Sequence, residues 1–222
     1  AGANTGVGYE ALVTSTTGTK NTSLGYQSSY NLTTGSENTV AGWAALLDNT
    51  TASYNTAFGN EALRSTTVGP NNTAVGYRSL HCNTTGDSNQ AIGRNSLCSN
   101  TTGCFNDAHG YAALECNTTA CYNSAFGSLA LRLNTTGGYN TAVGSEALKA
   151  NTTANGNTAV GYRGLLTNTT GSSNTASGYC SLALNTTGNQ NTATGFNALN
   201  GNTTGTQKRS YRYVCSWQKY NR

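Results

Sequence analysis

An asparagine recurs every 17 residues along almost the whole chain, without insertion or deletion. Glycine follows it four residues later in every repeat, and threonine twelve residues later in every repeat. Leucine follows it eight residues later in all repeats except the second, where Ser29 stands. The consensus is N-T-A-V-G-Y-x-A-L-x-x-N-T-T-G-x-x, numbered below as positions 1–17. The position-1 asparagines are Asn4, Asn21, Asn38, Asn55, Asn72, Asn89, Asn106, Asn123, Asn140, Asn157, Asn174 and Asn191.

This gapless register predicts an all-β β-solenoid of twelve coils. Each unit must stack on the previous one with fixed geometry. Seventeen residues are too few for a helical repeat of about 33 or more, but they suit one coil of a solenoid. Coils spaced by about 4.8 Å would make a rod of roughly 55 to 60 Å. We expect residues 1–3 to be a lead-in, 4–207 the solenoid and 208–222 a divergent tail.

Positions 3 and 5 should face one way and positions 4 and 6 the other, because side chains alternate along a strand. We interpret the small Ala and Gly face, joined by the leucines, as a narrow interior. The Val and Tyr face would then be an apolar stripe partly covered by another chain. In the alternative, this stripe is the core and the Ala and Gly face is a close backbone contact. Positions 7–11 fit either a second strand or a single helical turn.

The units starting at Asn157 (N-T-A-V-G-Y) and Asn168 (N-T-T-G) resemble repeats of bacterial and phage tail-fibre-domain proteins. They are more distantly similar to the head repeats of trimeric autotransporter adhesins. The resemblance covers residues 4 to about 205. It implies a surface-exposed fibre, often trimeric, without catalysis. We therefore expect a structural fibre or adhesin rod, which associates with itself and meets a surface receptor or glycan. The alternative is a solenoid that binds ice or glycan through its Thr and Asn ladders.

Charge and composition exclude several other classes of protein. Only 9% of residues are charged, and five of the twelve basic residues lie in the last fifteen positions. The remainder is nearly neutral, so it lacks the basic surface that nucleic acid requires. No apolar run approaches the roughly 20 residues of a membrane span. Seven cysteines without a metal-type CxxC pair favour an oxidising compartment, hence an extracellular location or a cell or virion surface.

We expect no enzymatic activity, metal or cofactor. The two histidines, His81 and His109, occupy different repeat positions and have no cluster of carboxylates near them in the sequence. The glycine columns suit backbone turns of positive φ and not phosphate binding.

The two asparagine columns differ in their sequence context. At position 1 we expect stacked side-chain amides or Asx-turns. At position 12 the motif N-T-T is a glycosylation sequon, although a second structural ladder is the alternative. Three further sequons begin at Asn21, Asn31 and Asn71. The position-12 candidates for glycosylation are Asn49, Asn83, Asn100, Asn117, Asn134, Asn151, Asn168, Asn185 and Asn202.

The threonine and cysteine columns suggest two further features. Thr at positions 13 and 14 resembles an ice-binding array, but adjacent Thr should point to opposite faces. Cys104 and Cys121 share a repeat position on neighbouring coils, at a spacing that permits a disulfide. Cys98 could bridge either Cys82 or Cys116.

The sequence leads to one hypothesis about each end of the repeat array. The repeat begins three residues from the start, so we expect this end to meet another subunit or a longer array. The tail 208–222 is either a cap or the product of a frameshift. A shift of one nucleotide permits Asn-Ala-Ala-Ile-Gly-Met-Phe-Ala-Leu-Gly-Lys-Asn-Thr-Thr-Gly, a thirteenth repeat in register, and the nucleotide sequence would test this.

Overall fold

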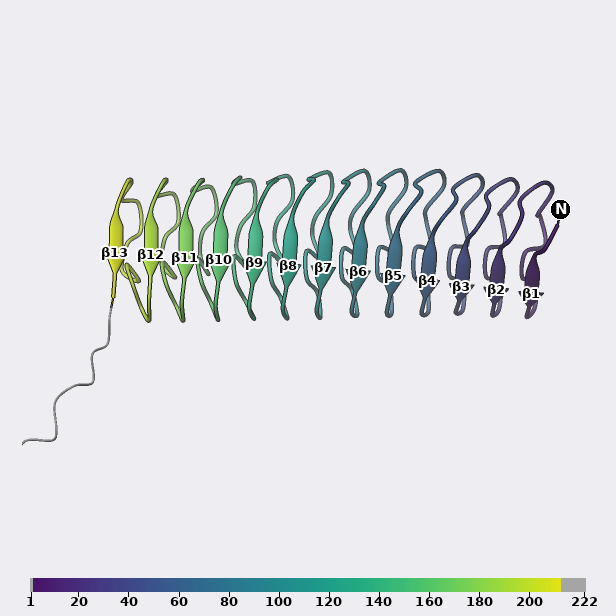
Figure 1. The fold of residues 1–222 in the computed structure, drawn as a ribbon, viewed down its shortest axis with the longest axis horizontal. Coiled ribbons are helices and arrows are strands. Elements are labelled where there is room, and N and C mark those ends of the chain that lie inside the picture. Colours follow the sequence, from purple (N-terminus) through teal and green to yellow (C-terminus); the bar gives the residue numbers. More distant parts are fainter. Residues whose placement is uncertain (1, 213–222) are drawn as a thin grey trace, which may run out of the picture.

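The computed structural model describes residues 2–212 as one β-solenoid (Figure 1). Thirteen three-residue strands form a single parallel sheet in sequence order. The prediction of an all-β solenoid with coils of 17 residues is confirmed. The strands are β1 (Thr5–Val7), β2 (Thr22–Leu24), β3 (Thr39–Ala41), β4 (Thr56–Phe58), β5 (Thr73–Val75), β6 (Gln90–Ile92), β7 (Asp107–His109), β8 (Ser124–Phe126), β9 (Thr141–Val143), β10 (Thr158–Val160), β11 (Thr175–Ser177), β12 (Thr192–Thr194) and β13 (Arg209–Tyr211).

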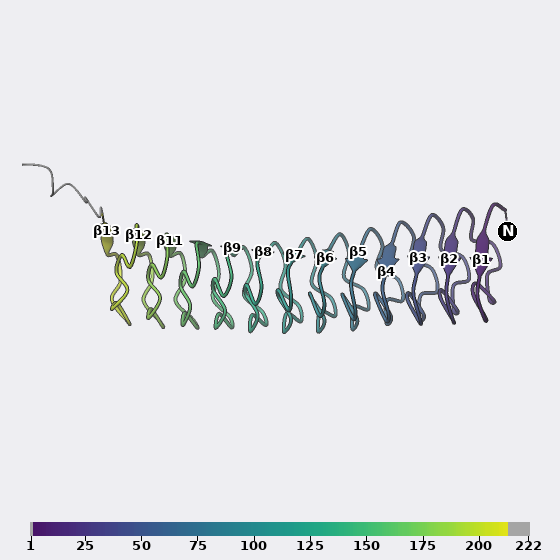
Figure 2. The same ribbon diagram turned by 90° about the horizontal axis from the view of Figure 1, so that it is seen from below.

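Every strand pairs with the next in strict register, so equivalent repeat positions stack along the rod. In β10 and β11, for example, Thr158 pairs with Thr175 and Ala159 with Ala176. The sheet runs along one side of the rod, and the rest of each coil lies on the other side (Figure 2). A substitution at one position therefore meets the same position of the coils above and below.

The interior is narrow and consists of small side chains together with one leucine per coil. Ala108 at position 3, Ala113 at position 8 and Leu114 at position 9 are all fully buried. Positions 4 and 6 point outward, and most of their side chains are exposed. The structure thus places the Ala column and the leucines inside, and it does not support the alternative in which the Val and Tyr stripe is the core.

The second coil shows how the interior tolerates a missing leucine. Ser29 stands at position 9, and the Ser23 hydroxyl lies 2.8 Å from Ser28 Oγ and 3.1 Å from Ser29 Oγ. All three serines are buried, and their mutual hydrogen bonds satisfy the hydroxyl groups there. Leu32, which replaces the asparagine of position 12 in the same coil, is also fully buried. The coil therefore keeps one leucine inside, at a different position.

Positions 7–11 form turns, so the expected second strand or helical turn is absent from every coil within residues 2–212. Asn95 and Leu97 have φ values of 58° and 49°, in the left-handed region. Alternation of such residues with right-handed ones is incompatible with both a helix and a strand. Tight turns result, in which Ser96 N–H donates to Gly93 O at 3.3 Å and Asn100 N–H donates to Leu97 O at 3.1 Å. Leu97 N–H also bonds Ala113 O of the next coil, at 3.0 Å.

The glycine of position 5 ends each strand where two coils approach most closely. Gly93 has φ of +133°, and an added Cβ would lie 2.5 Å from Gly110 O and 2.7 Å from its carbonyl carbon. Neither the conformation nor the space admits another residue. This explains why glycine occupies position 5 in all twelve repeats.

The solenoid path continues beyond the predicted boundary at residue 207. Strand β13 pairs with β12, and Arg212 N–H donates to Thr194 O at 2.8 Å. Residues 208–212 thus begin a thirteenth coil, whereas a separate tail was expected to start at Lys208. The rest of the proposed cap or frameshifted repeat, including Cys215 and Trp217, lies outside the described residues.

Replacing Leu114 by Ala should lower the free energy of unfolding by about 2–5 kcal/mol, because it leaves a cavity in the middle of the rod. Its neighbour Glu115 forms an ion pair with Arg132 at 2.7 Å on the surface. Glu115→Gln should therefore cost less than about 1 kcal/mol. Urea denaturation of both variants checks this, and equal losses would contradict the interior assignment of the leucine column.

Gly93 and Gly156 both have positive φ but differ in the space around them, so they allow a matched comparison of substitutions. Gly93→Ala should lose about 2–5 kcal/mol in chemical denaturation, since strain in φ adds to the clash with Gly110. Gly156 has φ of +66°, and an added Cβ would meet nothing closer than Ser173 Oγ at 3.9 Å. Gly156→Ala should cost about 1 kcal/mol. A smaller loss at Gly93 than at Gly156 would contradict the close approach of the coils.

Candidate functional surface

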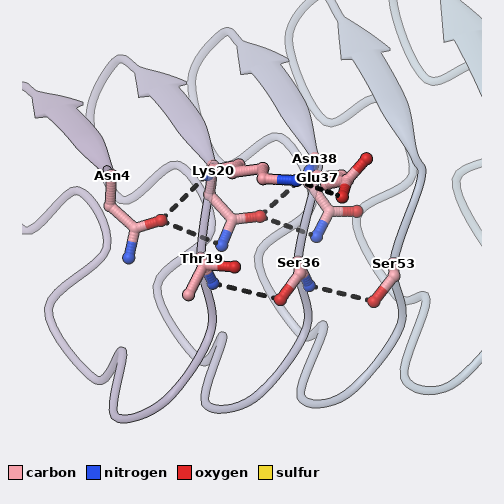
Figure 3. Close-up of polar contacts among 8 residues, drawn as sticks. Asn4, Thr19, Lys20, Ser36, Glu37, Asn38 and Ser53 are labelled. Atoms are coloured by element: carbon pink, nitrogen blue, oxygen red, sulfur yellow. Dashed lines mark hydrogen bonds and ion pairs between the residues drawn. The ribbon is translucent and has the colours of Figure 1, made fainter. Parts of the chain in front are cut away.

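The position-1 asparagines form an uninterrupted buried ladder, as expected from their column. Each side-chain oxygen accepts the backbone N–H of position 1 in the next coil, from Asn4 to Asn191, at 2.8–3.1 Å. Figure 3 shows the first steps, between Asn4 and Asn38. The side-chain nitrogens of Asn55 and Asn157 have no hydrogen-bond partner, although the oxygens of both residues take part in the ladder. The ladder links each coil to the next through side chains inside the rod.

The position-12 asparagines form a second internal ladder. From Asn100 to Asn202 each side-chain nitrogen donates to the side-chain oxygen of the preceding coil, at 2.8–3.1 Å. The side chains are fully buried from Asn49 to Asn185, and Asn202 is half-buried. A glycan would be attached to this nitrogen, so the folded solenoid has no room for one at the eight buried sequons. The geometry matches the alternative of a structural ladder.

The two ladders meet at one carbonyl in most coils. Gly103 O accepts from Asn89 Nδ2 at 2.8 Å and from Asn100 Nδ2 at 3.0 Å. Ala120 O likewise accepts from Asn106 at 2.8 Å and Asn117 at 3.1 Å. We call this three-group arrangement the asparagine clasp. It fastens the beginning of a coil to its end, and the repeat pattern does not predict it.

Position 16 forms a third, shorter ladder of side-chain acceptors. Thr19 N–H donates to Ser36 Oγ at 3.0 Å, and Ser36 N–H donates to Ser53 Oγ at 2.9 Å (Figure 3). Cys104 and Cys121 lie in this column, where Cys104 N–H donates to Cys121 Sγ at 3.0 Å. The two residues are thus adjacent, as their spacing predicts, but they are present as thiols without a disulfide.

The other described cysteines are also thiols. Cys82 N–H donates to Cys98 O at 3.0 Å, which places these two side by side on neighbouring coils. Burial raises the pKa of Cys98 to about 11, and burial together with Asp87 raises the pKa of Cys104 to about 11. Both thiols are therefore protonated near neutral pH and are weak nucleophiles.

The outward side chains of positions 2, 4 and 6 form a continuous surface along the sheet, which we call the sheet face. At position 4, Val7, Phe58 and Val160 expose 60%, 42% and 43% of their surface. Position 6 adds a column of aromatic residues. The exposed apolar side chains of the face are Val7, Tyr9, Leu24, Tyr26, Trp43, Phe58, Val75, Tyr77, Ile92, Tyr111, Val143, Val160, Tyr162, Tyr179 and Phe196.

Aromatic rings on the sheet face stack along the rod. Tyr9, Tyr26 and Trp43 have centroid separations of 5.2 and 6.2 Å, and Tyr162, Tyr179 and Phe196 have separations of 5.3 and 5.2 Å. These separations suit offset stacking, which contributes beyond simple burial. A further stack at position 17, outside this column, comprises Phe105, Tyr122 and Tyr139 and was not predicted from the sequence.

Charged groups on the sheet face lie in the middle of the rod and at the last described strand, where Arg209 occupies position 2. Across the twelve repeats, positions 2, 4 and 6 carry Arg94 and Asp107 as their charged residues, beside His109. The Arg94 guanidinium lies 5.7 Å from the Tyr77 ring and 6.0 Å from the Tyr111 ring. Asp107 Oδ1 lies 2.8 Å from His109 Nε2. Arg94 has no carboxylate partner among residues 2–212, whereas Arg78, Arg132 and Arg163 each have one.

The two threonine columns have different surroundings. At position 13, Thr101 Oγ1 donates to Thr118 O of the next coil at 3.0 Å, and the same bond recurs along the rod. At position 14 the side chains are exposed from Thr17 to Thr204, and Val68 interrupts this column of threonines. Because the hydroxyl groups of position 13 bond to the next coil, the exposed column of threonines is the one at position 14. An ice-binding array needs two outward columns.

Each histidine contacts one carboxylate. His81 Nε2 lies 3.5 Å from Glu61 Oε2, and His109 contacts Asp107 as described above. Burial lowers the pKa of His81 and thus favours its neutral form. Within residues 2–212, no group of three or more His, Cys, Asp or Glu side chains could hold a metal ion.

The comparisons with known proteins add no relative. No protein family model matches the chain, and neither a curated protein nor a solved structure matches it. In the described part of the chain, no helix has the length and apolarity that crossing a membrane requires.

Replacing Asn106 by Asp should cost about 3–5 kcal/mol of unfolding free energy, because a buried carboxylate would face Ala120 O without a donor. Burial should raise the pKa of the new carboxyl above its unfolded value, so stability should return as the pH falls. Asn155 offers the control: it is exposed, and its Oδ1 accepts from Gly138 N–H at 2.7 Å. Asn155→Asp keeps this acceptor. Equal losses in thermal unfolding would contradict the clasp.

Proposed function

We propose that the chain is a structural rod of an extracellular fibre or adhesin, and that other copies of the chain cover its sheet face. The observation that carries this proposal is the row of exposed Val, Leu, Ile, Phe, Tyr and Trp side chains, which extends from β1 to β12. Monomeric soluble proteins rarely expose contiguous apolar patches of more than a few hundred Å².

The side chains of this row are not needed to complete the core of the single chain. Alanine and leucine fill the interior, and the asparagine ladders satisfy the polar groups beside them. Valine or phenylalanine at position 4 therefore has no inward role. A second copy with the same periodic face would bury these side chains along the length of the rod.

The rigidity of the rod supports a structural role. Every coil is joined to the next by the sheet, the turn bonds and the asparagine ladders, all at the same period. The location outside the cell and the resemblance to fibre repeats belong to the same proposal. A surface receptor or glycan would be met by the completed fibre.

The alternative of an ice- or glycan-binding solenoid is favoured by one observation, the exposed threonine file of position 14. Its test is thermal hysteresis of the purified protein and retention on glycan arrays. Activity that persists after Thr102→Val and Thr119→Val would exclude this file as the binding surface.

Sedimentation equilibrium at micromolar concentration tests the fibre proposal, with negative-stain images of the same sample. We expect oligomers or filaments. Val75→Asp with Val143→Asp should shift the wild-type assembly to monomers, because two charges would have to be buried in the contact. Thr85→Asp with Thr153→Asp is the control on the opposite side of the coils, where both side chains are exposed. A wild-type chain that remains monomeric would overturn the proposal.

A further inference from the structure

Arg94 and Asp107 lie at opposite edges of the sheet face. Asp107 occupies position 2, where strand β7 begins, and Arg94 occupies position 6, just beyond the end of strand β6. The strand covers positions 2–4 and a bend follows at position 5, so the two positions lie at most about 13 Å apart across the face. Along the rod the two residues are thirteen positions apart, less than one 17-residue coil. Their heights along the rod thus differ by less than about 4.8 Å.

Both groups are available to a second copy of the chain. Arg94 is exposed and has no acidic partner among residues 2–212, since its guanidinium lies between the rings of Tyr77 and Tyr111. Asp107 uses Oδ1 toward His109, and its side chain is 34% exposed. A cation buried against an apolar face without a counter-charge would be costly. A copy that covers this face must therefore supply an acid.

Whether the second copy can place an acid opposite Arg94 depends on the relative directions of the two rods. If both run the same way, rotation about an axis along the rod brings the starting edge of one sheet beside the ending edge of the other. Arg94 then faces the column that contains Asp107 of the second copy, at a difference in height of about 4 Å that the long arginine side chain can span. If the rods run in opposite directions with their faces together, like edges meet. Arg94 then faces only position-6 residues, which are aromatic residues, asparagine, serine or another Arg94.

We propose that copies of this chain associate in parallel and in register through the sheet face, and that reciprocal Arg94 to Asp107 contacts between copies select this arrangement. In register both reciprocal pairs lie within about 4 Å in height, whereas a shift by one coil in either direction moves one of the two pairs to more than about 8 Å apart. Hydrophobic contact along the face is nearly the same for every register, because the repeat is regular. The charge pair supplies the discrimination that the apolar side chains lack. This inference rests on the proposed function.

Charge reversal in the full-length chain tests the contact, with the dissociation constant measured by sedimentation. Arg94→Glu and Asp107→Arg should each weaken association at least about tenfold, because each places like charges together at every contact. The double variant should recover most of this loss, since opposite charges face each other again. Arg132→Glu makes the same change of charge away from the sheet face, and it should leave association unchanged.

The orientation is measured separately with wild-type protein. Donor and acceptor dyes are attached selectively to the N-terminal amines of two samples, which are then mixed and allowed to associate. Parallel rods place the dyes close together, so efficient energy transfer is expected. Antiparallel rods would separate them by about the 55 to 60 Å length of the rod.

The outcomes separate the two proposals. Association that is insensitive to Arg94→Glu, absence of recovery in the double variant, or weak energy transfer in associated protein would overturn the parallel contact and leave the fibre proposal standing. A wild-type chain that stays monomeric would overturn both.

Discussion

The asparagine clasp is the interaction on which most coils of the solenoid depend. In a coil such as 89–103, two side-chain amides from different ends of the coil donate to one carbonyl, that of Gly103. Each amide also belongs to a ladder that continues into the neighbouring coils. The groups are buried, so each bond avoids the cost of a desolvated polar group without a partner. Closing the coil and stacking it are therefore one event.

This polar interior limits what else the coil can hold. With two asparagines and the nearby backbone occupying one side, the remaining volume accepts alanine at positions 3 and 8 and leucine at position 9, as at Ala108, Ala113 and Leu114. The aromatic side chains of position 6 lie outside. The same constraint that closes the coil leaves the sheet face apolar, which is why the proposed assembly follows from the fold of one chain. The exposed aromatic stacks and Arg94 are features of that outer face.

The regular repeat stabilises each rod, but it does not specify how two rods align with each other. A face of repeating Val and Tyr side chains offers nearly equal contact in many registers, much as uniform strands slip in a sheet. Departures from the consensus can supply what the repeat lacks. Arg94 and Asp107 are such departures, less than one coil apart in height and on opposite edges of the sheet face. In the proposed assembly, contacts between Arg94 and Asp107 fix the register of neighbouring rods, whereas the isolated rod does not need them.

The sequence by itself determined the period, the solenoid and the register, because an unbroken 17-residue repeat permits one stacking geometry. Strand alternation separated two faces, but only the structure placed the alanine and leucine columns inside. Only the tertiary structure decided the turns at positions 7–11, where Asn95 and Leu97 adopt left-handed conformations. It also decided that the sequons from Asn49 to Asn185 point inward and that both asparagine columns share one carbonyl. A side chain in a turn has no periodicity that reveals its direction. Its direction depends on hydrogen bonds to the next coil, and these exist only once the coils are stacked.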